Sequence, residues 1–148
     1  MKIECLDHVV IAVKDMDRAV EFMSKLFELE FQEVAPEMLP GFRICISQPD
    51  GKIELVSLLD AREAAQANPR MNETVDLMSR GYEGLMTIFL KVDDAAATSG
   101  EAEKLGACVA SSVHMDAGQL MPFLPKFTEV LFDDRAMPVK GLALIDRK

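Results

Sequence analysis

The sequence predicts an α+β protein in which two tandem β-α-β-β-β modules curl a mixed sheet around a cavity. Two observations support this fold class. The order strand, helix, strand, strand, strand can be traced twice, and the strand–helix junctions at 13–15 and 92–94 resemble each other. Two such units would place their helices outside a shared sheet. We expect one domain over the 148 residues, divided into a first module, a linker and a second module at 1–59, 60–82 and 83–148.

The first module begins with a β-branched, apolar strand at 3–14. Asp15 is a suitable N-cap for a helix whose apolar residues recur at helical spacing from Met16 to Phe27. Turns containing proline and glycine then separate three short strands, expected near 30–35, 42–48 and 52–59.

The second module repeats this order. A strand at 85–92 leads to a helix at 95–105, with an aspartate cap before the helix and Gly106 ending it. In the linker, Pro69 is expected to separate two short helical stretches. The three remaining strands are expected near 107–113, 127–132 and 139–146.

Composition excludes several classes of protein. The hydrophobic fraction of 49% and the mean hydropathy of +0.10 argue against general disorder. A net charge of −9 argues against nucleic-acid binding and against binding to anionic membranes. No signal-peptide or membrane-spanning pattern is seen, so a cytoplasmic location is expected. Cys5, Cys45 and Cys108 form no CxxC pair and have apolar neighbours, which predicts three buried, reduced thiols.

Three segments resemble the vicinal oxygen chelate superfamily, which includes glyoxalases, bleomycin-resistance proteins and dioxygenases. They are LDHVVIAVKDMDRAVEFMSKLFELEF (6–31), GKIELVSLL (51–59) and RGYEGLMTIFLKVDD (80–94). The nearest resemblance is to the methylmalonyl-CoA epimerase branch. It implies the glyoxalase-like fold, a homodimer and a divalent metal between the modules.

The resemblance also implies which residues would hold that metal: a histidine on the first strand of each module, and a carboxylate or amide on each fourth strand. His8 and Glu54 match the first two positions. From the residues alone, a satisfied core histidine is the usual explanation of His8, and a solvated edge position is the alternative for Glu54. Glu37 resembles a loop carboxylate that some epimerases use as an acid–base group.

The other two metal positions depart from the family pattern. Thr87 occupies the third and offers only a neutral hydroxyl. The fourth falls on Leu144 or Ile145, and only the following Asp146 carries a carboxylate. Asp146 shares a strand face with Leu144, so its availability depends on the strand register.

Two functions therefore follow from the sequence. The first is a diverged member of the superfamily that binds a small molecule beside an incomplete metal cage, with no metal or with weakly bound zinc, cobalt, nickel or manganese. The alternative is a metal-dependent isomerase or lyase resembling methylmalonyl-CoA epimerase, in which Glu37 and Glu54 would move the proton.

Overall fold

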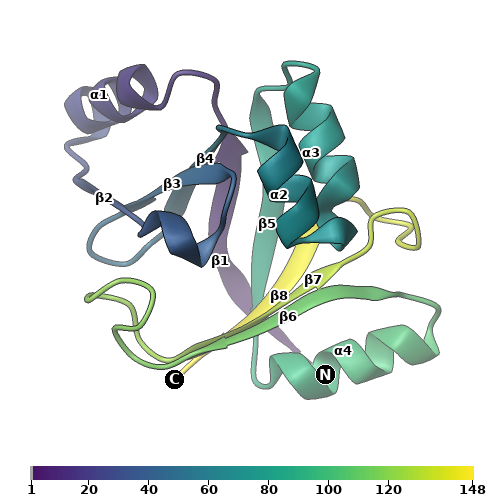
Figure 1. The fold of residues 1–148 in the computed structure, drawn as a ribbon. Helices are drawn as coiled ribbons and strands as arrows, with labels where there is room; N and C mark the ends of the chain where they lie inside the picture. The colour runs from purple at the N-terminus through teal and green to yellow at the C-terminus, as the bar shows by residue number, and fades with distance from the viewer. Residues whose placement is uncertain (1) are drawn as a thin grey trace. The chain divides into compact units, whose positions relative to one another are not determined.

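The fold is described for residues 2–148 of a computed structural model, and Met1, with which the predicted first module begins, lies outside them (Figure 1). The chain forms two compact units. The middle unit is Val9–Met86, and the terminal unit combines the residues up to His8 with Thr87–Lys148. The chain passes from one unit to the other within β1 (Ile3–Ala12) and again within β5 (Gly84–Val92).

The middle unit contains the first β-α-β-β-β sequence and the two linker helices. Its strands are ordered β2-β3-β4-β1, where the pairing of β1 with β4 is parallel and the other pairings are antiparallel. The elements of this unit that follow β1 are α1 (Met16–Phe27), β2 (Phe31–Glu33), β3 (Phe42–Ser47), β4 (Ile53–Leu58), α2 (Ala61–Ala67) and α3 (Asn72–Ser79), with 3₁₀ turns at Pro36–Met38 and Pro69–Met71.

Helix α1 begins and packs as its sequence predicts. The side chain of Asp15 accepts a hydrogen bond from the backbone N–H of Arg18 at 3.0 Å, which satisfies one of the free donors of the first turn. Met16 then packs with Cys45 and Leu55 in the core of the middle unit. The predicted Asp15 cap is confirmed.

The terminal unit contains the second β-α-β-β-β sequence. Its strands are ordered β5-β8-β7-β6, again with one parallel pairing, β5 with β8. This is the same order as β1-β4-β3-β2, so the predicted repeat and the α+β fold class are confirmed. The remaining elements are α4 (Ala95–Lys104), β6 (Val109–Met115), β7 (Phe127–Phe132) and β8 (Leu142–Arg147).

The cysteines differ from one another in their exposure to solvent. The cysteines are all free, but only Cys45 is buried, whereas Cys5 and Cys108 are exposed. The prediction of three buried thiols is wrong for these two. Cys5 lies in β1, where side chains alternate between the two faces, and Cys108 lies in the loop just before β6, so apolar neighbours in sequence do not report burial at either position. Among residues 2–148, no helix is both long and apolar enough to cross a membrane.

Candidate functional site

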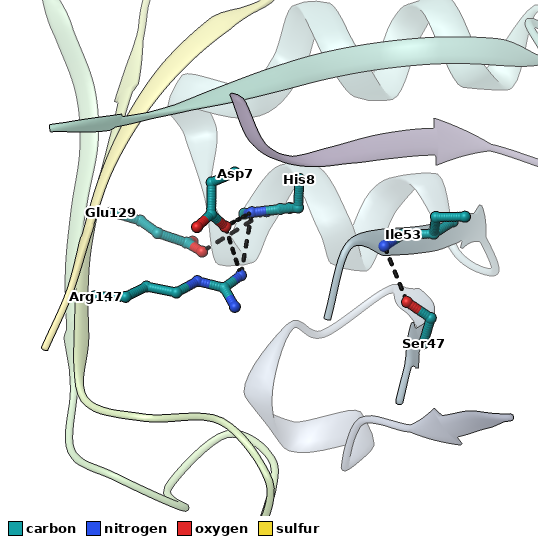
Figure 2. Close-up of polar contacts among 6 residues, drawn as sticks. All are labelled: Asp7, His8, Ser47, Ile53, Glu129 and Arg147. Atoms are coloured by element: carbon teal, nitrogen blue, oxygen red, sulfur yellow. Dashed lines mark hydrogen bonds and ion pairs between the residues drawn. The ribbon is translucent and has the colours of Figure 1, made fainter. Parts of the chain in front are cut away.

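A buried histidine in the terminal unit is held by a carboxylate and a guanidinium. Only 2% of the surface of His8 is exposed, and its Nδ1 lies 2.8 Å from Oδ1 of Asp7 (Figure 2). Nη2 of Arg147 lies 2.8 Å from the same Asp7 oxygen and 3.3 Å from Nδ1 of His8. Asp7 therefore receives two charge-assisted contacts in a place where an unpaired carboxylate would be costly.

These distances indicate which ring nitrogen of His8 carries the proton. In a neutral histidine, one ring nitrogen donates and the other accepts. The 2.8 Å contact of Nδ1 with the Asp7 carboxylate is shorter than its 3.3 Å contact with Arg147, so Nδ1 is the donor, and it donates to Asp7. The lone pair of His8 is then on Nε2. A carboxylate that orients the second nitrogen in this way is typical of metal-binding and of proton-accepting histidines.

A second carboxylate faces Nε2. Oε1 of Glu129, on β7, lies 4.0 Å from Nε2 of His8, which is too long for a direct hydrogen bond (Figure 2). The side chain of Glu129 is 21% exposed, compared with 2% for His8. The site is therefore more accessible to solvent on the Glu129 side of Nε2.

Phe89 on β5 closes one face of the imidazole. The two rings are stacked, with centroids 4.1 Å apart and planes inclined by 13°. Because side chains alternate along a strand, Thr87 lies on the same face of β5 as Phe89. Ala143 is the register partner of Phe89 on β8, and Arg147 follows it on the same face. The third family position, Thr87, therefore lies on the sheet face that carries the histidine.

The register also identifies the fourth family position. Glu54 pairs with Val10 in the parallel β1–β4 ladder. In the second module, Phe89 is equivalent to Val10, since each lies three residues before its strand–helix junction, and Phe89 pairs with Ala143. The equivalent of Glu54 is thus Ala143, which is completely buried, and not one of the two following residues that sequence comparison selected.

Leu144 and Asp146 lie on the opposite face of β8. Leu144 packs with Ala95 in a hydrophobic core beneath α4. The carboxylate of Asp146 accepts a hydrogen bond from the backbone N–H of Ala95 at 2.9 Å, deep in the same core. Asp146 is therefore bound to the first turn of α4, and the strand period directs it away from the face of His8.

The donors of the terminal unit do not by themselves form the metal cage that the family resemblance implies. A tetrahedral zinc ion lies about 2.0–2.2 Å from each donor, which would bring Nε2 and the carboxylate oxygen to about 3.4 Å. The observed separation is 4.0 Å, Thr87 adds only a hydroxyl, and Ala143 adds no donor. Within residues 2–148, no group of three or more His, Cys, Asp or Glu side chains is arranged to hold a metal ion. The guanidinium of Arg147 beside the imidazole further opposes a second cation.

The two remaining predicted site residues belong to the middle unit. Glu54 is half-buried on β4, where its register partners are Val10 and Ile46. Glu37 is exposed in the 3₁₀ turn at Pro36–Met38. The catalytic roles expected for both residues remain predictions, as does the expectation that His8 and Glu54 face one cavity.

Sequence reasoning missed Asp7, Glu129 and Arg147. A signal for Asp7 was available, because a carboxylate within an apolar strand needs a cationic partner when it is buried. No comparable signal marks Glu129 or Arg147, since charged residues at alternate strand positions usually face solvent. Their role depends on the pairing of β7 with β8, in which Glu129 lies opposite Ile145.

Comparison with known proteins agrees with this fold. The family model described as "Glyoxalase-like domain" matches residues 6–144. A methylmalonyl-CoA epimerase from Mycobacterium tuberculosis superposes with a TM-score of 0.66 at 18% identity, covering 99% of this chain and 89% of that chain. A methylmalonyl-CoA epimerase in complex with methylmalonyl-CoA and NH4+ superposes with a TM-score of 0.68 at 18% identity, covering 99% and 96%. A variant of the Streptomyces coelicolor epimerase in complex with 2-nitronate-propionyl-CoA gives 0.67 at 18% identity, covering 99% of both chains. Among curated protein sequences, none matches significantly.

Proposed function

Because this chain belongs to the family of glyoxalase-like domains, we propose that it binds a small molecule at Nε2 of His8, beside an incomplete metal cage. One observation carries the proposal: a buried imidazole is oriented by Asp7 so that its lone pair faces Glu129. Orienting a histidine in this way requires two buried charges, which is costly and brings little net stability. A role in ligand binding therefore explains these buried charges better than a contribution to folding stability does.

The residues around Nε2 have separate tasks in this proposal. Asp7 keeps the proton on Nδ1, so that Nε2 accepts a hydrogen bond or a proton from the ligand. Phe89 covers the ring and excludes water from one side. The hydroxyl of Thr87 offers a further hydrogen bond on the same sheet face.

A second candidate is a metal-dependent isomerase or lyase resembling methylmalonyl-CoA epimerase. The observation that favours it is the presence of two proton-active groups, Nε2 of His8 and the Glu129 carboxylate, within 4.0 Å of each other. Deuterium incorporation next to the thioester carbonyl of methylmalonyl-CoA, measured in D2O with and without added cobalt, distinguishes the two candidates. The binding-protein proposal predicts no incorporation in either case.

Metal content tests the incomplete cage. We expect the purified chain, dialysed against cobalt and then against buffer, to retain well under one ion per chain by elemental analysis. Thr87→His adds a third nitrogen or oxygen donor on the face of His8 and should raise the retained cobalt. Thr98→His, the same substitution on α4, serves as the control. Stoichiometric metal in the unmodified chain would refute the proposal.

Binding is tested by nuclear magnetic resonance of the imidazole nitrogens. The chain has two histidines, so His8 and His114 give separate signals, and exposed His114 acts as an internal reference. Methylammonium, acetate and acetamide serve as probes: a cation, an anion and a neutral amide. A saturable shift of His8 with any of the three supports the proposed site, and no shift with all three argues against it.

The homodimer and the cytoplasmic location belong to the same proposal. Light scattering of the purified chain measures the oligomeric state, and a molar mass of one chain would contradict the dimer. Fractionation of the producing cells tests the location.

A further inference from the structure

We propose that the outward face of α1, defined by Phe22 and Leu26, is where two copies of this chain meet, with their α1 helices antiparallel across a two-fold axis. This inference rests on the homodimer of the proposed function and names its contact surface. It follows from two exposed apolar side chains and from the order of the charges beside them.

Helix α1 carries apolar side chains on its solvent-facing side as well as toward the core. Met16 is buried in the core of the middle unit, and Val20 packs against that core. Phe22 and Leu26 are instead 61% and 57% exposed, and they share one face of the helix because they are four residues apart. In Figure 1, α2 and α3, the other helices of the middle unit, lie away from α1. Since phenylalanine is enriched at interfaces, this apolar pair indicates a surface that a partner covers.

The charges beside this apolar pair are arranged along one side of the helix. At about 100° per residue, Arg18 and Lys25 border the pair on that side. Glu21 and Glu28 lie just beyond them on the same side, and Glu28 is the C-cap residue. A two-fold axis perpendicular to the helices places this side against its own copy with the chain direction reversed.

Reversal of the chain direction makes these charges complementary to themselves. With the axis beside Met23, Lys25 faces Glu21 of the other copy, because both lie two residues from Met23. Arg18 faces Glu28 in the same way, since both lie five residues from Met23. These pairings arise only from the same sequence in reverse order, so the charges favour a second copy as the partner. The antiparallel order also aligns the two helix dipoles favourably.

The same axis brings the apolar side chains together. Phe22 would pack between Phe22 and Leu26 of the other copy, each offset by about 3 Å along the helix, which is two residues at about 1.5 Å. Helix α1 has 12 residues and is therefore about 18 Å long, so the contact is smaller than a standard interface of about 1,600 Å². We therefore expect an association that depends on protein concentration.

Sedimentation equilibrium of the full chain over about a hundredfold range of concentration tests this face. The molar mass should rise from one chain toward two. Phe22→Glu and Leu26→Glu each place a carboxylate in the apolar centre and should weaken the dimer about tenfold or more. Leu105→Glu, at an 87% exposed leucine that ends α4, is the matched control and should leave the association unchanged. Because all three side chains are exposed, the urea midpoints should stay close to that of the unmodified chain.

Charge reversal tests the antiparallel arrangement without altering the apolar pair. Glu21→Lys and Lys25→Glu each place like charges opposite one another in their own dimer, so each variant alone should associate about tenfold more weakly or less. An equimolar mixture of the two variants restores opposite charges between different chains and should form a heterodimer.

The outcomes separate this inference from the proposed function. An unchanged dimer in Phe22→Glu and Leu26→Glu, or a mixture that associates no better than its components, would overturn the inference while the homodimer stands. A chain that sediments as one copy at every concentration would overturn the homodimer as well, and the titration of His8 would still decide ligand binding. Cosedimentation of that single chain with phosphatidylcholine vesicles would assign the face to a lipid surface and would also overturn the inference.

Discussion

Replacing Asp7 by asparagine removes the charge that joins His8 to Arg147 and leaves the shape of the side chain nearly unchanged. The side chains of Asp7 and Arg147 are 3% and 13% exposed, so the guanidinium would remain buried without the Asp7 charge. Removing one member of a buried ion pair typically costs about 3–5 kcal/mol. Because asparagine still offers an oxygen to Nδ1 of His8, we expect about 3 kcal/mol, at the lower end of that range.

A double-mutant cycle separates the interaction between Asp7 and Arg147 from the effect of removing either side chain alone. Arg147→Met should cost a similar amount, since it leaves the Asp7 carboxylate buried without the Arg147 charge. The double variant Asp7→Asn/Arg147→Met buries neither charge, and it should be at least about 2 kcal/mol more stable than the sum of the single effects predicts. Glu101→Gln, which breaks an exposed pair on α4, is the control and should not change stability measurably.

Urea unfolding measures these differences. With a typical slope of about 1–3 kcal/mol per molar, the midpoint of Asp7→Asn should fall by about 1–3 M. Additive effects in the double variant, or a cost below about 1 kcal/mol for Asp7→Asn, would show that Asp7 and Arg147 are not coupled. This result would refute the description of His8 as held in place by the ion pair of Asp7 and Arg147.

Four further variants test other parts of the structure. Asp146→Ala removes a buried acceptor from the first turn of α4 and should cost about 1–3 kcal/mol in urea unfolding, and an unchanged midpoint would contradict the α4 contact. Gly100→Ala, at a helical position with nothing within 4 Å of the new Cβ, should stabilise by about 0.5–1 kcal/mol. Gly41→Ala should instead destabilise by more than about 1 kcal/mol, because its φ is +82° and the new Cβ would lie 2.4 Å from the backbone of α2. A hydrogen bond from Arg135 lowers the pKa of Asp133 to about 2, so the contribution of this pair is present above about pH 4 and lost as the pH falls toward 2. In Arg135→Gln, the carboxyl carbon of Asp133 should titrate near 3.8, its ordinary value, and a midpoint still near 2 would contradict this cause.

Much of the fold follows from local sequence. The caps at Asp15 and Asp94, the period of the apolar residues in α1 and the glycine at 106 predict the elements in their observed order. Such signals depend on neighbours within a few residues, which a single sequence displays. His8 was also found from sequence, through the family motif that contains it.

The partners of His8 could not be found in this way. Arg147 lies at the other end of the chain, and Glu129 reaches Nε2 because of the register in which β7 pairs with β8. A shift of one residue in β8 would turn Arg147 away and bring Asp146 to the same face, and nothing local in the sequence distinguishes these two registers. The sequence alone therefore determined the repeat, its elements and the histidine. The tertiary structure decided which charges meet that histidine and which side chain takes the place equivalent to Glu54, because strand pairing over long sequence separations sets the face on which each side chain lies.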